Sequence, residues 1–337
     1  MMKKNRFRQA IGRTGGLLLA GALALSLAAC GGGQQTPSPS ADPASGLSTP
    51  AKAPSDSGTA VKQTAYPITV KDATGTELVF DKAPERIVTI APSETETVFA
   101  VGAGSKVVGV DKWSDYPEEA KSKPSVGDMN TNIEALLATK PDLVIAHDGL
   151  QHKVVEQLRE LKIKVYASNT KTLDQTIEKI ETFGLVLNTQ EQAKKVTDKM
   201  KADRQKVMDA VKDAPKKKVY MEFSPGWTVG DGEYLNELLA LAGGVNVAAG
   251  KPGWYKVDPE AIIQANPEVI LYGKGNNNGM GDILAELKKR PGFDQIDAMK
   301  AGRTYPIDDN LTSRVGPRMT EALLEMAKAI HPDRVKQ

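Results

Sequence analysis

One twelve-residue pattern occurs twice in this chain and constrains the fold more than any other feature. The second copy, Glu260–Leu271, begins 126 residues after the first copy, Glu134–Ile145, and aligns with it without a gap. Each copy predicts a short helix, a turn marked by Pro and a buried strand. The spacing is too long for a solenoid repeat. The chain is therefore predicted to have two lobes of like construction, each with a Glu in the first turn of the repeated helix.

The first 30 residues have the features of an export leader. A basic start precedes an apolar run, Leu17–Ala29, that is too short to span a bilayer comfortably. The run ends in Leu27-Ala28-Ala29-Cys30, which resembles the lipobox of bacterial lipoproteins. This resemblance implies that Cys30 becomes the lipidated N-terminus after cleavage. The alternative is an ordinary signal peptide with an incidental Cys.

The composition narrows the class of protein further. Residues 31–65 consist mostly of small and polar residues, which predicts a disordered tether. The following stretch of about 270 residues is long enough for two domains. Lys and Arg total 44 against 42 Asp and Glu, and the signs are mixed, so nucleic acid is not an expected partner. Cys30 is the only cysteine, which excludes internal disulfides and Cys-rich metal sites.

The segment 66–188 alternates strand and helix patterns, which predicts an α/β lobe with a mainly parallel sheet. An opening hairpin joins Ile68–Val70 to Glu77–Phe80. The expected buried strands that follow are Arg86–Ile90, Val107–Val110, Leu143–Ala146 and Lys164–Tyr166. Helix starts are predicted at two capping boxes, Ser93–Glu96 and Thr131–Glu134.

A long helix is predicted over 189–213, because apolar residues keep helical spacing through a charged sequence until Pro215. At 1.5 Å per residue, its roughly 25 residues would extend about 37 Å. The expected fold class is therefore α/β, with two Rossmann-like lobes, 66–188 and 215–337, joined by one connecting helix, 189–214. A ligand cleft is expected between the lobes. A single stiff connection predicts limited opening and closing.

The three tryptophans indicate where a ligand would bind. Trp113, Trp227 and Trp254 each follow a predicted strand or lie in a Gly/Pro loop. In open α/β sheets, ligands bind beyond the carboxyl ends of the strands, and aromatic faces there suit a large, flat, partly apolar ligand. The alternative is that each indole packs its loop onto its own lobe.

Polar residues near the same ends are further candidates. Arg314 and Arg318 lie in a loop before the last helix, where a guanidinium could hold a carboxylate, phosphate or amide oxygen. A surface ion pair or a strut within the second lobe is the alternative, favoured for Arg318. His147 and Asp148 end a predicted strand, and His147 could bind a metal or a substrate, or make a simple polar contact. The sequence has three His, too few for a His-rich metal site.

The repeated acidic residues have two interpretations. Glu134 and Glu260 each fit the first turn of a helix for local reasons alone. Capping does not require them to occupy matching places in a repeat, so docking of a partner that contacts both lobes is the preferred interpretation. Enzymatic motifs, including a Gly-rich phosphate loop and Gly-x-Ser-x-Gly, are absent from the sequence.

Residues 68–333 resemble the substrate-binding lipoproteins of ABC importers for ferric siderophores and vitamin B12. The stretches that carry the resemblance are Pro84–Glu96, Val108–Val110, Ser114–Pro117, Asn132–Glu134 and Lys140–Ile145. The resemblance implies two α/β lobes, one connecting helix and a ligand in the cleft. It also implies that an acidic pair, Glu134 and Glu260, contacts Arg residues of the permease.

Within this family, the vitamin B12-binding members are the most similar. That similarity implies ligand contacts from Trp113, Trp227, Trp254 with its neighbour Tyr255, and Arg314. Two features depart from the pattern. A further Trp expected just before Met129 is absent, and His147 stands where another aromatic residue is expected.

The resulting hypothesis is a monomeric lipoprotein, tethered to the outer face of the cell membrane, that delivers cobalamin to an ABC permease with its ATPase. It needs no cofactor, since cobalamin is cargo. Three alternatives remain open. A ferric siderophore or haem could be the ligand, a surface enzyme could use His147 with Asp148, or the lipoprotein could be purely adhesive.

Overall fold

Two β-sheets of related construction organise the structure. The computed structural model describes residues 63–275 and 282–336. The sheet of the first lobe has four parallel strands in the order β4-β3-β5-β6. The sheet of the second lobe has the order β10-β8-β7-β11-β12, with β9 also paired to β7, and it mixes parallel and antiparallel neighbours. The expected α/β class with two lobes is confirmed.

The first lobe opens with the predicted hairpin, whose two strands pair antiparallel around a turn at Gly75. Its elements are β1 (Ile68–Lys71), β2 (Glu77–Phe80), β3 (Ile87–Thr89), α1 (Pro92–Ala100), η1 (Gly104–Lys106), β4 (Val107–Val110), η2 (Glu118–Ser122), α2 (Ile133–Ala138), β5 (Leu143–His147), α3 (Asp148–Glu160), β6 (Val165–Ser168) and α4 (Leu173–Leu187).

The second lobe follows the long helix α5 (Gln190–Val211). Its elements are β7 (Lys217–Ser224), β8 (Trp227–Val229), α6 (Tyr234–Leu241), β9 (Gly244–Asn246), β10 (Trp254–Lys256), α7 (Pro259–Ala265), β11 (Val269–Gly273), α8 (Ile283–Lys289), η3 (Phe293–Gln295), α9 (Asp297–Lys300), β12 (Thr304–Ile307), α10 (Asp309–Ser313) and α11 (Met319–Ile330). Among the described residues, no helix combines the length and apolarity needed to cross a bilayer.

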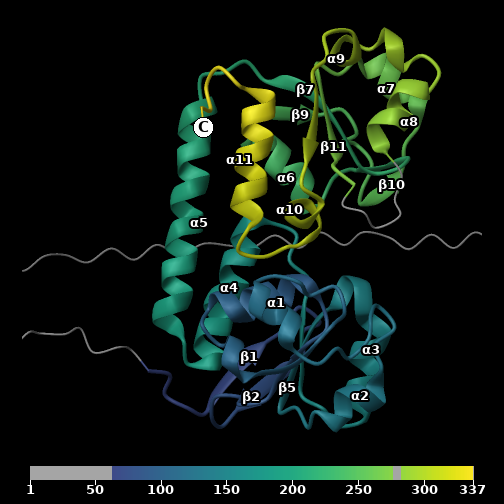
Figure 1. Cartoon of the computed structure of the whole chain (residues 1–337). Coiled ribbons are helices and arrows are strands. Elements are labelled where there is room, and N and C mark those ends of the chain that lie inside the picture. The colour runs from purple at the N-terminus through teal and green to yellow at the C-terminus, as the bar shows by residue number, and fades with distance from the viewer. Residues whose placement is uncertain (1–62, 276–281, 337) are drawn as a thin grey trace, which may run out of the picture. The chain divides into compact units, whose positions relative to one another are not determined.

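Helix α5 packs against α4 of the first lobe and α11 of the second (Figure 1). Its 22 residues correspond to about 33 Å of helix. Buried Ala193, Met200 and Val207 form its apolar stripe, while ion pairs between residues four apart occupy the exposed side. The stripe belongs to one apolar cluster that also contains Ile145 of the first sheet and Leu271 of the second. The core is therefore continuous from lobe to lobe along α5.

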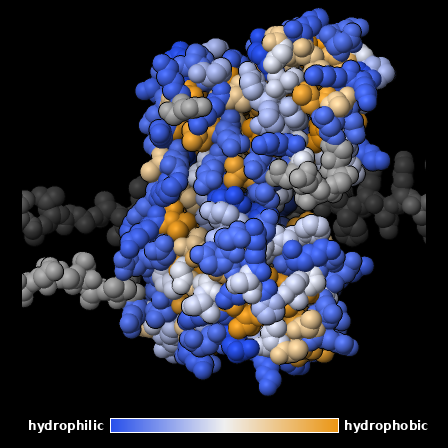
Figure 2. Space-filling model, viewed as in Figure 1, coloured by the Kyte–Doolittle hydropathy of each residue, from blue (hydrophilic) through white to orange (hydrophobic). Residues whose placement is uncertain are grey.

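Alternate residues of each central strand face opposite sides of its sheet, as a strand requires. In β5, Leu143 and Ile145 join the cluster along α5, whereas Val144 and Ala146 join a second cluster beneath α3. Both faces of the sheet are thus covered, which explains the uninterrupted apolar strand sequences. The outer surface shown in Figure 2 is mainly hydrophilic, with hydrophobic residues in small separate areas.

The repeat identified in the sequence is present in the structure. It forms α2 with β5 in the first lobe and α7 with β11 in the second. The residue before each repeated Pro has a left-handed backbone, with φ of 50° at Lys140 and 47° at Asn266. The residue after each Pro accepts a hydrogen bond from a neighbouring strand, Asp142 from Arg86 N and Glu268 from Lys218 N. The two halves therefore share turn chemistry as well as topology.

The capping box predicted at Ser93–Glu96 is wrong. Helix α1 begins at Pro92, a residue well suited to a first helical position, so Ser93 lies inside the first turn. Glu96 does not reach back to the helix start, because it is buried and bound to arginines of the second lobe. In the other predicted box, Asn132 and not Thr131 caps the helix, accepting from Ala135 N at 3.0 Å.

The leader with Cys30, and residues 31–62 of the predicted tether, lie outside the described residues.

Candidate ligand-binding site

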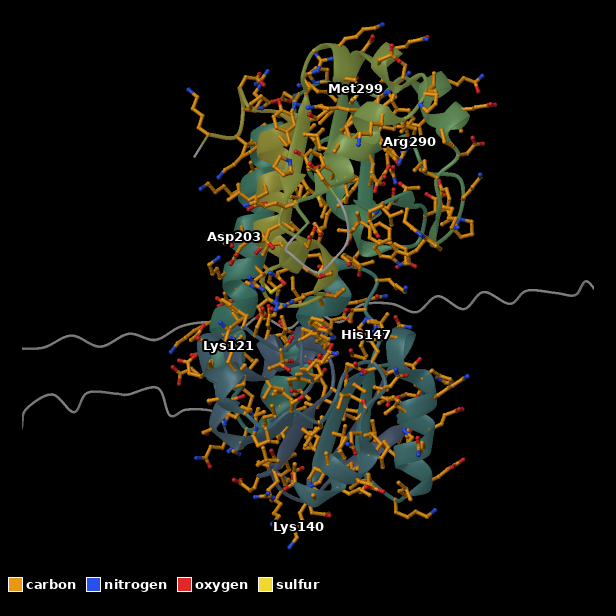
Figure 3. All side chains as sticks on the ribbon, turned by 45° about the vertical axis from the view of Figure 1, so that its right-hand side comes forward. Lys121, Lys140, His147, Asp203, Arg290 and Met299 are labelled. Atoms are coloured by element: carbon orange, nitrogen blue, oxygen red, sulfur yellow. The ribbon has the colours of Figure 1, made fainter. Side chains whose placement is uncertain are left out.

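The carboxyl ends of the first-lobe strands bring several predicted site residues to one edge of the sheet. Trp113 lies in the loop after β4, and His147 is the last residue of β5. Figure 3 places His147 and Lys140, which lie at opposite ends of the β5 segment, at opposite ends of this lobe. Trp113 and His147 therefore occupy the edge where ligands bind in open α/β sheets.

Large apolar side chains are exposed at this edge. Trp113 is 48% exposed and Leu150, at the start of α3, is 61% exposed. Tyr116 and Met129, in the segments that follow β4, are also exposed. Single exposed apolar residues are ordinary, but a group that follows adjacent strand ends indicates a contact surface. The sequence analysis missed Tyr116, Met129 and Leu150, although their positions after strand ends were a usable signal.

In the second lobe, Trp227 and Trp254 lie in short paired strands rather than in the loops expected from the sequence. Strand β8 pairs antiparallel with β10, and Trp227 lies opposite Lys256 while Trp254 lies opposite Val229. This register puts both indoles on one face of the two-stranded ribbon. Trp227 is exposed, so it does not fix its strand to its own lobe.

Trp254 and Tyr255, which were expected to contact a ligand, make packing and hydrogen-bond contacts within the second lobe. Trp254 is half-buried and packs edge-on against Phe223, with ring centroids 4.6 Å apart, and against Tyr234 at 5.7 Å. Tyr255 is the next residue in the strand, so its side chain is directed to the opposite face. Its hydroxyl donates to the Ala248 carbonyl at 2.5 Å. The structure brings Trp254 and Trp227 together and places Tyr255 apart from them.

Arg314 and Arg318 reach from the second lobe to Glu96 of α1 in the first lobe. Arg314 Nη1 lies 2.8 Å from Glu96 Oε1. Arg318 binds the same carboxylate through Nε at 2.9 Å and Nη2 at 2.6 Å. Both arginines are therefore in ion pairs, but these are buried, whereas the alternative in the sequence analysis was a surface ion pair. The pairs join the two lobes rather than bracing the second lobe.

The first-lobe loop that carries Trp113 surrounds this arginine pair. Arg314 pairs with Asp115 at 2.7 Å and donates to the Trp113 carbonyl at 3.4 Å. The Arg318 guanidinium lies 4.0 Å from the centre of the Tyr116 ring, in cation–π geometry. We refer to Glu96, Asp115, Arg314 and Arg318 as the arginine cluster.

Contacts connect this cluster to the indole ribbon. The Tyr234 hydroxyl, beside Trp254, donates to the carbonyl of Thr312, two residues before Arg314. Gly316 lies in the same loop, and a Cβ there would be 3.3 Å from the Ser93 carbonyl oxygen of α1. A larger residue at position 316 would therefore need a small shift of the loop away from α1. A continuous set of contacts leads from Trp254 to Trp113.

Next to the cluster, Glu94 and Lys179 form a buried ion pair at 2.9 Å. Ser168 Oγ donates to Glu94 at 2.7 Å, and Lys179 Nζ also donates to the Val315 carbonyl at 2.9 Å. Lys179 belongs to α4 and Val315 follows Arg314, so this pair is a second connection to the loop of the second lobe. The sequence did not indicate either partner, because a contact between residues 85 positions apart leaves no local pattern.

The surroundings of His147 favour the neutral form of its imidazole. Its Nδ1 atom is buried and has no hydrogen-bond partner in the part of the chain that the structure describes. Burial lowers the pKa of His147, an effect that the charge of Glu94 only partly opposes. Asp148 does not bind His147, because its carboxylate contacts His152 Nδ1 at 2.8 Å. The pair His147–Asp148 considered for an enzyme is therefore not formed.

Glu134 and Glu260 occupy equivalent positions in the first turns of α2 and α7. Both side chains are exposed, and within 63–275 and 282–336 neither forms an ion pair or side-chain hydrogen bond. The caps of these helices are Asn132 and Asp258, so neither Glu is needed for capping. The purely local explanation of the two acidic residues is therefore weakened.

Two surface hollows are not lined by any of the tryptophans, although the second includes Lys179 of the buried ion pair described above. One of about 380 Å³ is beside β12 and α11 in the second lobe. The other, of about 370 Å³, is beside β6 and α4 in the first lobe. The first hollow includes Tyr305 and Lys328, and the second includes Asn169 and Lys179. Neither is lined by a residue predicted to bind ligand. No group of three or more potential metal-ligating side chains occurs within the described ranges.

Comparisons with known proteins agree with this architecture. The family described as periplasmic binding protein matches residues 87–311. YvrC of Bacillus subtilis, named as an ABC transporter substrate-binding lipoprotein, is 34% identical over 293 residues, covering 84% of this chain and 91% of that protein.

Two solved structures share the fold. The vitamin B12 binding protein BtuF of Vibrio cholerae has a TM-score of 0.66 and 26% identity, covering 75% of this chain and 99% of that one. The haem-binding protein RhuT of Roseiflexus sp. RS-1 has a TM-score of 0.66 and 27% identity, with coverage of 75% and 99%.

The fold and these similarities define a two-lobed binding protein rather than an enzyme. The chain belongs to the periplasmic binding protein family, as the sequence resemblance indicated, and it is a substrate-binding protein of an ABC transporter.

Proposed function

We propose that this protein captures cobalamin between its lobes and delivers it to an ABC permease. The observation that carries the proposal is the combination of exposed apolar side chains with neighbouring arginines whose charge the protein itself neutralises. Trp113, Leu150 and Trp227 are exposed, whereas Arg314 is paired with Glu96 and Asp115. Lys112, the residue before Trp113, is paired with Asp128 at 2.8 Å.

This combination favours a large, partly apolar ligand without a high negative charge. Each aromatic side chain buried by a ligand contributes about 1.5–3 kcal/mol. An anionic ferric siderophore or the carboxylates of haem would need cations that are free to pair, and pairing with Arg314 would require displacement of an existing carboxylate. Cobalamin has amide groups on the edge of its corrin ring, and these can accept from a guanidinium that keeps its own counterions. The similarity to BtuF supports the same ligand class.

Haem is the second candidate ligand, supported by a specific feature. His147 lies at the end of β5 that faces the candidate site, and its lowered pKa favours the neutral imidazole, which is a good iron ligand. The similarity to RhuT supports haem to the same degree as BtuF supports cobalamin. The charge of the site favours cobalamin.

A ligand panel tests the choice. Tryptophan fluorescence and thermal shift should be measured with cyanocobalamin, haemin and a ferric catecholate siderophore under the same conditions. Cobalamin is expected to quench the fluorescence with submicromolar affinity and to raise the melting temperature in a concentration-dependent way, because a ligand that binds only the folded state stabilises it. Tighter binding of haemin or the siderophore would contradict the proposal.

We also propose that Glu134 and Glu260 dock the two lobes onto the permease. Exposed carboxylates at equivalent positions suit a partner with basic residues, since opposite charges steer and align such contacts. Glu134→Arg with Glu260→Arg should leave cobalamin affinity unchanged and reduce uptake by cells. Glu118→Arg combined with Glu286→Arg is a control with the same change of charge outside the repeat. Normal uptake by the first double variant would argue against docking through these residues.

The remaining parts of the proposal concern anchoring. Cys30 is proposed to be lipidated, with residues 31–65 as the tether, which would hold a monomeric binding protein at the outer face of the membrane. The native protein should incorporate a labelled fatty acid in growing cells, and Cys30→Ala should abolish that incorporation, as measured on the immunoprecipitated protein. Equal labelling of the native protein and Cys30→Ala would contradict lipid anchoring at this residue.

A further inference from the structure

The two carboxylates that hold Arg314 differ in their freedom to move. The Glu96 side chain is only 2% exposed and is bound by both Arg314 and Arg318. The Asp115 side chain is 53% exposed, and Arg314 is its one ion-pair partner among the residues with a described structure. Glu96 is therefore a fixed part of the cluster, whereas Asp115 is a solvent-accessible counterion.

The backbone next to Asp115 is held in place. Ser114 is buried, and its hydroxyl contacts Thr95 Oγ1 at 2.6 Å and also the carboxylate of Asp111. The backbone N–H of Trp113 donates to Asp111 Oδ2 at 3.0 Å. The loop thus presents exposed Trp113 and exposed Asp115 on either side of an anchored residue. A ligand that contacts Trp113 would come close to the Asp115 carboxylate.

Asp115 also determines the charge of the arginine cluster. Arg314 and Arg318 supply two positive charges, and Glu96 and Asp115 supply two negative charges, so the cluster is neutral. Without Asp115 the cluster would have one net positive charge next to Trp113. An anionic ligand would then meet a guanidinium with an unoccupied side, whereas in the native protein it meets the negative charge of Asp115 first.

We propose that Asp115 acts as an internal counterion that makes the site select uncharged ligands over anionic ones. This inference rests on the proposed function, because it assumes that the ligand binds beside Trp113 and Arg314. Asp115 lowers the affinity for anions by repulsion and by occupying Arg314. It has little effect on an uncharged ligand, which neither is repelled nor needs to displace it.

The test compares Asp115→Asn with the native protein, using the full mature chain and fluorescence titration with cyanocobalamin, haemin and a ferric catecholate siderophore. Removing one partly exposed charge should raise the affinity for each anionic probe about tenfold or more at low salt, and the gain should shrink as salt is added. The ratio of anion affinity to cobalamin affinity should therefore rise about tenfold at low salt, because an uncharged ligand is much less sensitive to this Coulomb interaction.

Two further variants make the result specific. Asp115→Glu keeps the charge and should behave like the native protein toward all three probes. Asp174→Asn removes an exposed aspartate that also pairs with an arginine, Arg204, but lies on α4 away from the arginine cluster. It changes the net charge by the same amount and should leave every affinity unchanged.

The outcomes separate the two proposals. If the native protein prefers cobalamin and Asp115→Asn leaves the anion affinities unchanged, the counterion inference is wrong and the proposed function stands. If the native protein binds haemin or the siderophore more tightly than cobalamin, the proposed function fails and the inference that rests on it fails as well. An equal gain in Asp174→Asn would also overturn the inference, because it would show an effect of net charge alone.

Discussion

Replacing Glu96 with Gln should destabilise the whole protein, because one carboxylate holds two arginines across the lobes. The carboxylate accepts three hydrogen bonds, from Arg314 at 2.8 Å and from Arg318 at 2.9 and 2.6 Å. Removing one partner of a buried ion pair costs about 3–5 kcal/mol, since the remaining charge stays buried without compensation. Arg314 would keep Asp115, and Arg318 would keep the Tyr116 ring. We therefore expect the lower end, about 3 kcal/mol.

This loss can be measured by thermal unfolding. Unfolding entropy of about 2.1 cal/mol/K per residue over roughly 270 residues gives about 0.57 kcal/mol/K. A loss of about 3 kcal/mol then corresponds to a decrease of about 5 °C in Tm. Glu181→Gln is the matched control, because Glu181 pairs with Lys201 where both side chains are about half exposed, and such pairs contribute about 0–1 kcal/mol. A decrease below about 1 °C for Glu96→Gln, or the same decrease in the control, would refute the reasoning.

Three other predictions concern the indoles and His147. Trp113→Ala combined with Trp227→Ala should weaken cobalamin binding by about 3–6 kcal/mol. The loss of stability should be small, because both indoles are exposed. Unchanged affinity in titration calorimetry would show that these indoles are not part of the site. Trp254→Ala should instead lower Tm, since this ring packs on Phe223 and Tyr234. Burial lowers the pKa of His147 in the folded protein, so below about pH 6.5 the unfolded state binds more protons than the folded state. The free energy of unfolding therefore falls as the pH decreases through this range. His147→Asn should reduce the slope of unfolding free energy against pH between 7 and 5, and an unaltered slope in urea titrations would contradict this assignment.

Local sequence patterns predicted the elements of the fold well. The repeated helix, Pro turn and strand were found where the two copies lie, because their signals are contained within a few residues. The connecting helix was expected to cover 189–213 and is Gln190–Val211, a small difference of the kind that fraying ends produce. The antiparallel ribbon of β8 and β10 was missed, since three-residue strands separated by α6 and β9 carry little periodic signal.

The candidate site was less accessible to sequence analysis because its main contacts are between distant residues. Glu96 satisfied a capping pattern, yet its partners Arg314 and Arg318 lie more than 200 positions away. The Glu96 carboxylate could either cap its own helix or bind the distant arginines, and in the structure it is buried and binds both arginines. Trp254 was expected to face a ligand, but neighbouring rings that the sequence could not place cover much of it.

The apolar cluster shared along α5 has a consequence for how the protein can be divided. If the chain were cut after α5, this helix would lose its packing against α6 and α11. Met200 and Val207 would then be exposed, and each fragment would present an apolar surface to water. Separately expressed halves should therefore aggregate, and the intact protein should melt in a single cooperative step.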